Sequence, residues 1–381
     1  YELLYFFQEN IGFFCILLYT KPSYYFYMIG GVNMNLNKKP IIGIVSKHFL
    51  KDEIGPNMFI RDEIKQAIFD NGGIAIGIIL PKDEKEQTKV NTDTLINSKY
   101  IKELHSIEDE NVKCSGYVLI NKNGDNYKYT PYLKCGKYYE TTSLVDYIKK
   151  NETVVTSDDG LYQYNNKLIF RGENPNNLVK IDEGTYRIIE IEDDKIRLIS
   201  TDRYKDRVTW DNRYNINEEK YVGINNFEKS RLKDYLKDAY NSDFFSDAER
   251  KFMVSYDLCI GKRNLDDESI DGVVECSNKY PDMKIGMLYA SEYMRASIDP
   301  NCTSTSDLSC TNYNFFDSIS SDFDTLTAVA DDTYQFYFVD DGVLDVKKAS
   351  SNFSFYPVIY IDKNTLYAAG DGTEENPYTV R

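Results

Sequence analysis

The sequence predicts an α+β protein whose sheets are mainly antiparallel. From residue 91 onward, short β-branched and aromatic runs alternate with polar turns, as is typical of antiparallel strands. Apolar residues with helical spacing occur only in a few short segments. A single strand–helix–strand pattern stands near the start, and the 381 residues are enough for two or three domains.

Residues 1–37 form a leader that we expect to be disordered or artefactual. Their longest apolar run, Ile11–Tyr19, is far shorter than the ~20 residues of a membrane-spanning helix. Glu2 and Glu9, rather than basic residues, precede that run, and no small-residue cleavage site follows it. The segment therefore fits neither a signal peptide nor a membrane span, and we expect no membrane span in this chain.

Residues 38–85 carry the strand–helix–strand pattern. Ile41–Val45 is a β-branched apolar run, as expected of a buried strand. Phe59–Asp70 has helical apolar spacing and is followed by Asn71-Gly72-Gly73, which predicts the end of the helix. Ile74–Leu80 is a second buried strand, so we expect a short βαβ unit with a right-handed crossover.

The same residues carry a resemblance to a known family. The stretches KKPIIGIVSKH and FIRDEIKQAIFDNGGIAIGIILP resemble the opening of a class I glutamine amidotransferase-like domain of the gamma-glutamyl-gamma-aminobutyrate hydrolase (peptidase C26) kind. The resemblance implies a nucleophilic Cys in a Gly-x-Cys-x-Gly turn, with His and Glu further along the chain. None of the 7 cysteines has that context, and no His follows His105. What the resemblance implies is thus a truncated fragment without its catalytic residues, and Ser46-Lys47-His48 is interpreted as an ordinary polar loop.

A charged linker and a small β unit are predicted next. Lys82–Lys89 has no apolar period, which favours a solvated linker. The β unit spans residues 91–150. It opens with a helix at Thr92–Leu104, which has one apolar face, and continues with a β-hairpin between residues 116 and 133 around an Asn-Gly-Asp turn.

Residues 160–381 are predicted to form the largest domain. Strand patterns recur between residues 161 and 200 and again at 334–339 and 354–361. Apolar residues at helical spacing predict three short helices, at Lys229–Tyr240, Ser246–Val254 and Ser291–Ala296. The second of these begins with a capping-box pattern.

Six cysteines in the strand-rich part of the chain are the candidate site residues, and we expect them to form disulfides. Six cysteines allow many connectivities, of which pairing between sequence neighbours is the simplest. Zinc binding and reduced thiols are the alternatives, but no Cys-x₂-Cys pair exists and no His lies nearby. Disulfides are typical of an extracytoplasmic protein. The candidates are Cys114, Cys135, Cys259, Cys276, Cys302 and Cys310.

A second resemblance covers roughly residues 91–381. KCSGYVLINKNGDNYKYTPYLKCGKYYET and GLYQYNNKLIFRGENPNNLVKIDEGTYRIIEIEDDKIRLIS look like pilin-like or surface-exposed proteins of low-GC Gram-positive and Mollicutes-type bacteria. LCIGKR, KIGMLYASEYMRAS and FYPVIYI are similar to a C-type-lectin-like domain of the formylglycine-generating-enzyme group. The prepilin hallmark, a Gly-Phe-x-x-x-Glu start to a long apolar helix, is absent. The resemblance implies a lectin-like domain over residues 160–381 in a cell-surface or secreted protein.

Adjacent carboxylates and the single tryptophan have ordinary structural interpretations. Four Asp-Asp pairs could bind Ca²⁺ or act as glycosidase acids and bases, but two of them precede Gly, so turns are favoured. No metal site is predicted. Trp210-Asp211-Asn212 is interpreted as a core tryptophan beside a turn. The Asp-Asp pairs are Asp158-Asp159, Asp193-Asp194, Asp331-Asp332 and Asp340-Asp341.

The net charge of the chain and the motifs that it lacks disfavour several classes of function. With 45 Lys and Arg against 61 Asp and Glu, the formal charge is −16, which disfavours binding to nucleic acid. The chain has no glycine-rich phosphate loop, so we expect no nucleotide cofactor, and 2 His are too few for a His-rich metal centre. We expect a non-catalytic, extracytoplasmic binding or adhesion module for a protein or glycan ligand. The alternative is a cytoplasmic gamma-glutamyl amide hydrolase.

Overall fold

The fold is described from a computed structural model that covers residues 41–45, 74–78, 86–97, 101–123, 126–192 and 194–381. Contacts divide the chain into two units, residues 1–141 and 142–381. Among the described residues the sheets are mainly antiparallel and five short α-helices accompany them. The predicted α+β class is therefore confirmed at this level. The leader at residues 1–37 and the helix expected at Phe59–Asp70 lie outside the described residues.

The first unit begins with two parallel strands, β1 (Ile41–Val45) and β2 (Ile74–Ile78). They pair in register from Ile41 opposite Ile74 to Val45 opposite Ile78. Both strands were expected from their β-branched runs, and parallel pairing is what a strand–helix–strand sequence predicts.

The rest of the first unit is an antiparallel sheet. Its strands are β3 (Gln87–Asn91), β4 (Leu104–His105), β5 (Lys113–Asn123), β6 (Asn126–Cys135) and β7 (Tyr139–Glu140). The order is β3-β5-β6-β7, and β4 also pairs with β5. The long β5–β6 hairpin confirms the one predicted between residues 116 and 133.

Two expectations for this sheet were wrong. Residues 87–89, expected in a linker, belong to β3, because their backbone pairs with β5 even though their side chains are polar. The helix expected over Thr92–Leu104 is much shorter: α2 covers Thr92–Asn97, and Leu104 lies in β4. Pairing with β5 satisfies the backbone of Leu104 in place of helical hydrogen bonds.

The second unit begins with α3 (Leu144–Asn151), a helix that the sequence analysis did not predict and whose residues it assigned to the 91–150 unit. Ser143 caps this helix by accepting a hydrogen bond from the Asp146 N–H. Leu144, Val145 and Ile148 are buried in the hydrophobic core of the second unit. The Leu144 N–H also donates to the Thr365 carbonyl near the C-terminus. The helix thus belongs to the second unit.

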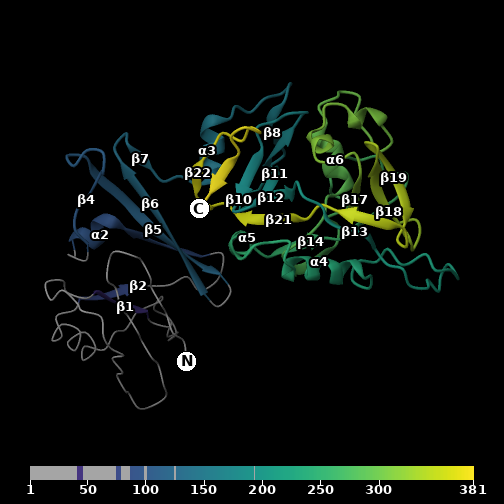
Figure 1. The fold of residues 1–381 in the computed structure, drawn as a ribbon, viewed down its shortest axis with the longest axis horizontal. Coiled ribbons are helices and arrows are strands. Elements are labelled where there is room, and N and C mark those ends of the chain that lie inside the picture. Colours follow the sequence, from purple (N-terminus) through teal and green to yellow (C-terminus); the bar gives the residue numbers. More distant parts are fainter. Residues whose placement is uncertain (1–40, 46–73, 79–85, 98–100, 124–125, 193) are drawn as a thin grey trace, which may run out of the picture. The chain divides into compact units, whose positions relative to one another are not determined.

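The largest sheet of the second unit has eight strands. They are β8 (Gly160–Tyr164), β9 (Lys167–Arg171), β10 (Leu178–Ile181), β11 (Gly184–Ile191), β12 (Lys195–Ser200), β21 (Val358–Asp362), β22 (Tyr367–Ala369) and β23 (Tyr378–Val380). The main order is β21-β12-β11-β10-β23-β22, and β9 joins β8 to β11. The C-terminal strand β23 therefore lies inside the sheet, in parallel with β10 (Figure 1).

A second sheet in this unit has the order β15-β17-β18-β19, formed by β15 (Lys262–Arg263), β17 (Phe323–Val329), β18 (Gln335–Asp340) and β19 (Val343–Lys348). The unit also contains two separate two-stranded sheets. One pairs β13 (Tyr204–Thr209) with β20 (Asn352–Phe355), and the other pairs β14 (Tyr256–Cys259) with β16 (Lys279–Met283). The strand expected at 354–361 is thus divided between β20 and β21.

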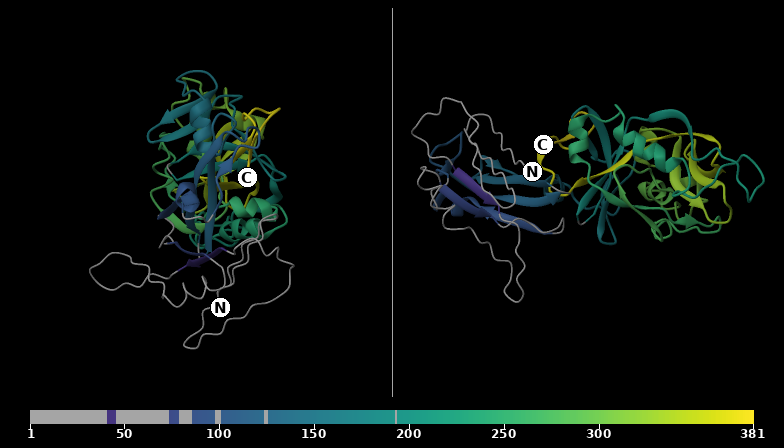
Figure 2. Two further views of the ribbon diagram at one scale, coloured as in Figure 1. Left: turned by 90° about the vertical axis from the view of Figure 1, so that its left-hand side faces the viewer. Right: turned by 90° about the horizontal axis from the view of Figure 1, so that it is seen from below.

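The three helices predicted in this unit are present as α4 (Leu232–Asn241), α5 (Asp247–Phe252) and α6 (Ala290–Ala296). Ser246 and Glu249 form the predicted capping box of α5. Helix α6 contacts strands of both the large sheet and the four-stranded sheet. Figure 2 shows the ribbon from two further directions. Trp210 is 1% exposed and stacks on Phe336, so the prediction of a core tryptophan is confirmed.

Candidate functional site

The candidate site is a cleft of about 620 Å³ in the second unit. The first wall is formed by Glu173 and Asn174, which come just after β9 in the sequence. The second wall is the irregular segment 299–318, which contains the short 3₁₀ helices η1 (Leu308–Thr311) and η2 (Phe315–Ser318). Its lining is polar except for one aromatic ring. The lining residues are Glu173, Asn174, Asp299, Thr311, Asn312, Tyr313, Asn314, Asp317 and Ser318.

The first wall is held by Asp159. Its carboxylate accepts hydrogen bonds from the backbone N–H groups of Glu173 (2.9 Å) and Asn174 (2.8 Å). Gly172, just before them, has φ +103°, and a Cβ there would collide with Asp159. The Gly172 N–H donates to the Ala296 carbonyl at 2.8 Å. Glu173 and Asn174 are therefore presented on a fixed backbone.

The second wall is organised by Asp299. Its carboxylate accepts from the Asn301 N–H (2.8 Å) and from Asn312 Nδ2 (2.7 Å). These hydrogen bonds, that of Asn312 first, hold the pKa of Asp299 below its ordinary value. Asn314 is buried, and its Nδ2 lies 2.8 Å from the Tyr293 carbonyl and 3.0 Å from the Cys310 carbonyl. Asp299 is thus ionised at neutral pH, and the loop around it is fixed.

Asp317 differs from the other carboxylates because its pKa is raised. Burial is the main cause, and the negative charges of Glu173 and Asp341 raise the pKa further. The Tyr293 hydroxyl lies 3.0 Å from Asp317 Oδ1, and a hydrogen bond from it opposes the increase. Protonation of Asp317 therefore begins at a higher pH than for an ordinary aspartate.

Tyr313 supplies the aromatic ring of the cleft. Its side chain is 56% exposed and its backbone has φ +49°, a left-handed conformation that is unfavourable for a bulky residue. The surrounding loop must hold it in place, because this conformation costs about 1–3 kcal/mol. The ring is thus presented to solvent beside carboxylates and amides.

Three disulfides join the cysteines that the sequence singled out. They link Cys114 to Cys135, Cys259 to Cys276 and Cys302 to Cys310, which is the sequence-neighbour pairing. The Cys302–Cys310 bond closes a loop within the segment 299–318 that forms the second wall of the cleft. Three disulfides indicate an oxidising, extracytoplasmic environment.

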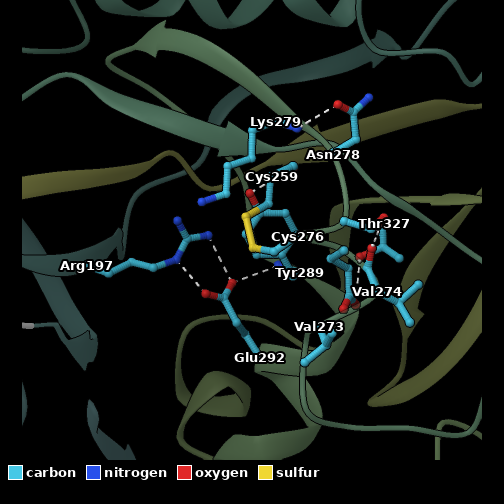
Figure 3. Close-up of a disulfide and its surroundings, with 12 residues drawn as sticks. Arg197, Cys259, Val273, Val274, Cys276, Asn278, Lys279, Tyr289, Glu292 and Thr327 are labelled. Carbon is cyan, nitrogen blue, oxygen red and sulfur yellow. Dashed lines mark hydrogen bonds and ion pairs between the residues drawn. A yellow bond between two sulfur atoms is a disulfide. The ribbon is translucent and has the colours of Figure 1, made fainter. Parts of the chain in front are cut away.

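The Cys259–Cys276 disulfide lies beside a buried ion pair (Figure 3). The Tyr289 hydroxyl donates to the Cys259 carbonyl at 3.0 Å, and the Tyr289 N–H donates to Glu292 Oε2 at 2.9 Å. Glu292 in turn pairs with Arg197, whose Nε lies 2.5 Å from Glu292 Oε1. This cluster connects α6 to the large sheet, and none of its residues lines the cleft.

No family model matches the sequence. No curated protein and no solved structure matches it either. In the part of the chain that the structure describes, no helix is long and apolar enough to cross a membrane. The same residues contain no group of three or more His, Cys, Asp and Glu placed to hold a metal ion.

The cleft offers carboxylates, amides and hydroxyls, together with one tyrosine. Every cysteine among the described residues is in a disulfide, so none of them offers a thiol nucleophile. His105, the described histidine, pairs with the Glu110 carbonyl and Glu103 in the first unit. Sequence reasoning missed Glu173, Asp299, Tyr313 and Asp317 as a group. The nearest signal was the polar sequence on either side of Cys302 and Cys310.

Proposed function

We propose that the protein is a bacterial cell-surface or secreted, non-catalytic binding module that takes a glycan in the cleft of its second unit. The observation that carries the proposal is the lining: residues with carboxylate, amide and hydroxyl groups line the cleft together with Tyr313, which is 56% exposed. Sugar hydroxyls can donate to these acceptors while an apolar sugar face covers the ring.

A glycan fits this cleft better than a protein surface does. The centre of a protein–protein interface is more apolar than its rim, whereas the cleft lining holds no aliphatic side chain larger than that of Thr311. The lining contains Glu173, Asp299 and Asp317 but no Lys, Arg or His. Neutral or amine-bearing sugars are therefore the expected ligands, and sulfated, sialylated or uronic acid glycans are disfavoured by charge repulsion.

Two further facts support the proposal. The three disulfides are typical of proteins that work outside the cytoplasm. The resemblance of residues 91–381 to pilin-like surface proteins, with a C-type-lectin-like C-terminal part, leads to the same class of function.

The test is a glycan array probed with the full chain, followed by titration calorimetry with the best ligand. We expect Tyr313→Ala to weaken binding about tenfold or more, because loss of a central aromatic contact costs more than 1.4 kcal/mol. Tyr221→Ala is the matched control, since Tyr221 is 76% exposed and does not line the cleft. Failure to bind any neutral or amine-bearing glycan, or equal affinities for both variants, would exclude the proposal.

A further inference from the structure

Lys262 and Asn225 bring an amine and an amide together in the second unit. Lys262 lies on β15, and Asn225 lies in the segment before α4. Lys262 Nζ is 2.5 Å from Asn225 Oδ1. The carbonyl carbon is one bond from that oxygen, so it lies at most about 3.7 Å from Nζ, close to the separation of reacting atoms in a near-attack arrangement.

The Asn225 amide is fixed in that orientation. The residue is 1% exposed, and its Nδ2 donates to the Val329 carbonyl (2.9 Å) and the Gln335 carbonyl (2.7 Å). Because both carbonyls can only accept, the nitrogen of the amide must face them. A protonated Lys262 Nζ can only donate hydrogen bonds, so the amide atom that faces it must be the acceptor, Asn225 Oδ1. The amide carbon is therefore held next to the amine.

Asp332 completes the cluster. Its Oδ1 lies 3.4 Å from Asn225 Nδ2 and is held by the N–H groups of Tyr334 (2.8 Å) and Gln335 (2.7 Å). Burial lowers the pKa of Lys262, and the Asp332 carboxylate opposes that decrease without cancelling it. A larger fraction of the amine is thus neutral and nucleophilic than for an exposed lysine. The Asp332 carboxylate is close enough to act on the charge of Lys262 and lies 3.4 Å from the amide nitrogen of Asn225, so it can carry a proton.

We propose that Lys262 and Asn225 form an intramolecular amide cross-link with loss of ammonia. The neutral Nζ attacks Asn225 Cγ, a new Nζ–Cγ bond forms, and the Cγ–Nδ2 bond breaks. Asp332 takes a proton from Nζ and passes it to the departing nitrogen. Starting from the protonated lysine, the products are one secondary amide and one ammonium ion, so atoms and charge balance and no oxidant is required.

Such a bond would brace the four-stranded sheet. It closes a loop with a sequence separation of 37 residues, and Lys262 is paired through β15 to β17 at Ala328. The inference does not depend on the cleft or on the proposed glycan ligand, because none of the three residues lines that cleft.

The test is the intact mass of the full chain after reduction and alkylation. We expect a deficit of one ammonia relative to the sequence, and a branched tryptic peptide that joins the Asn225 and Lys262 segments. A mass equal to that of the sequence overturns the proposal. So does a deficit of one ammonia without a branched peptide, which would indicate a succinimide at an asparagine instead.

Variants identify the residues involved. Lys262→Arg and Asp332→Asn should each restore the full mass, because one lacks the nucleophile and the other lacks the proton carrier. Lys347→Arg is the control, since Lys347 forms an ion pair with Asp324 and faces no amide in the contacts described. This variant should keep the deficit. A deficit retained in Lys262→Arg, or a deficit of water in place of ammonia, would place the bond elsewhere and overturn the assignment.

Discussion

Replacement of Glu292 by Gln should destabilise the second unit more than any surface change. Arg197 and Glu292 are 1% and 3% exposed, and their pair combines the contact between Arg197 Nε and Glu292 Oε1 with a 3.0 Å hydrogen bond from Nη2 to Oε2. Burial lowers the pKa of Arg197, but the Glu292 charge more than compensates, so the guanidinium stays charged. Glu292→Gln would leave that charge buried without its counterion.

The expected cost is about 3–5 kcal/mol, the usual result of removing one partner of a buried pair. For a unit of this size it corresponds to a decrease in Tm of about 6–20 °C. The assay is urea unfolding of the full chain, monitored by the fluorescence of Trp210. Trp210 is the one tryptophan of the chain and is buried in the second unit, so its signal reports that unit alone.

Two controls make the result interpretable. Asp247→Asn removes an ion pair with Arg250 in the same unit, but Asp247 is 92% exposed, so the cost should be about 0.2–1 kcal/mol. The double variant Arg197→Met/Glu292→Leu removes both charges and should be more stable than Glu292→Gln. If Glu292→Gln cost no more than Asp247→Asn, the reasoning from burial would be refuted.

Three further predictions use the same unfolding assay. Cys302→Ser/Cys310→Ser opens a loop with a sequence separation of 8 residues, and chain entropy predicts a loss of about 2.5 kcal/mol in the free energy of unfolding. Glycan binding should also weaken, and unchanged stability would contradict this prediction. Tyr186→Phe removes a buried 2.5 Å hydrogen bond to Glu249 and should cost about 1.5–3 kcal/mol, whereas a neutral result would show that the bond contributes nothing. Asp317 has a raised pKa, so its ionisation lowers stability as the pH rises above the ordinary value of 3.8. Asp317→Asn should therefore be more stable than the wild type at neutral pH and lose that advantage in acid. The variant should also bind glycan less well. If variant and wild type were equally stable at both pH values, the prediction would be contradicted.

Local signals in the sequence predicted the elements that local interactions determine. The capping box at Ser246 and Glu249 starts a helix because both hydrogen bonds are made within one turn. The β5–β6 hairpin is likewise set by alternation on either side of a short turn. The cysteine pairs are close in sequence, and for Cys114 and Cys135 the hairpin itself brings the two side chains together.

Elements that depend on distant partners were not predictable in this way. β3 is polar and charged, and it is a strand only because β5 offers an open edge. α3 follows the first unit directly in sequence, yet its apolar face is buried in the core of the second unit. The position of β23 beside β10 depends on pairing between residues about 200 apart, which no local pattern reports.

The cleft was missed for the same reason, and its construction indicates which group is available to a ligand. The cleft brings together Glu173 and Asn174 with the distant segment 299–318. Two carboxylates, those of Asp159 and Asp299, are used to hold the loops of these walls in place. Asp159 accepts from two backbone N–H groups of the first wall, and Asp299 accepts from Asn301 and Asn312. Because these bonds and the Cys302–Cys310 disulfide fix the loops before a ligand arrives, binding pays little ordering entropy. Asp317 differs from them in its pKa. Although it accepts a hydrogen bond from the Tyr293 hydroxyl, its carboxylate carries a raised pKa instead of a lowered one, so a donor from a ligand would relieve an unfavourable charge at this position.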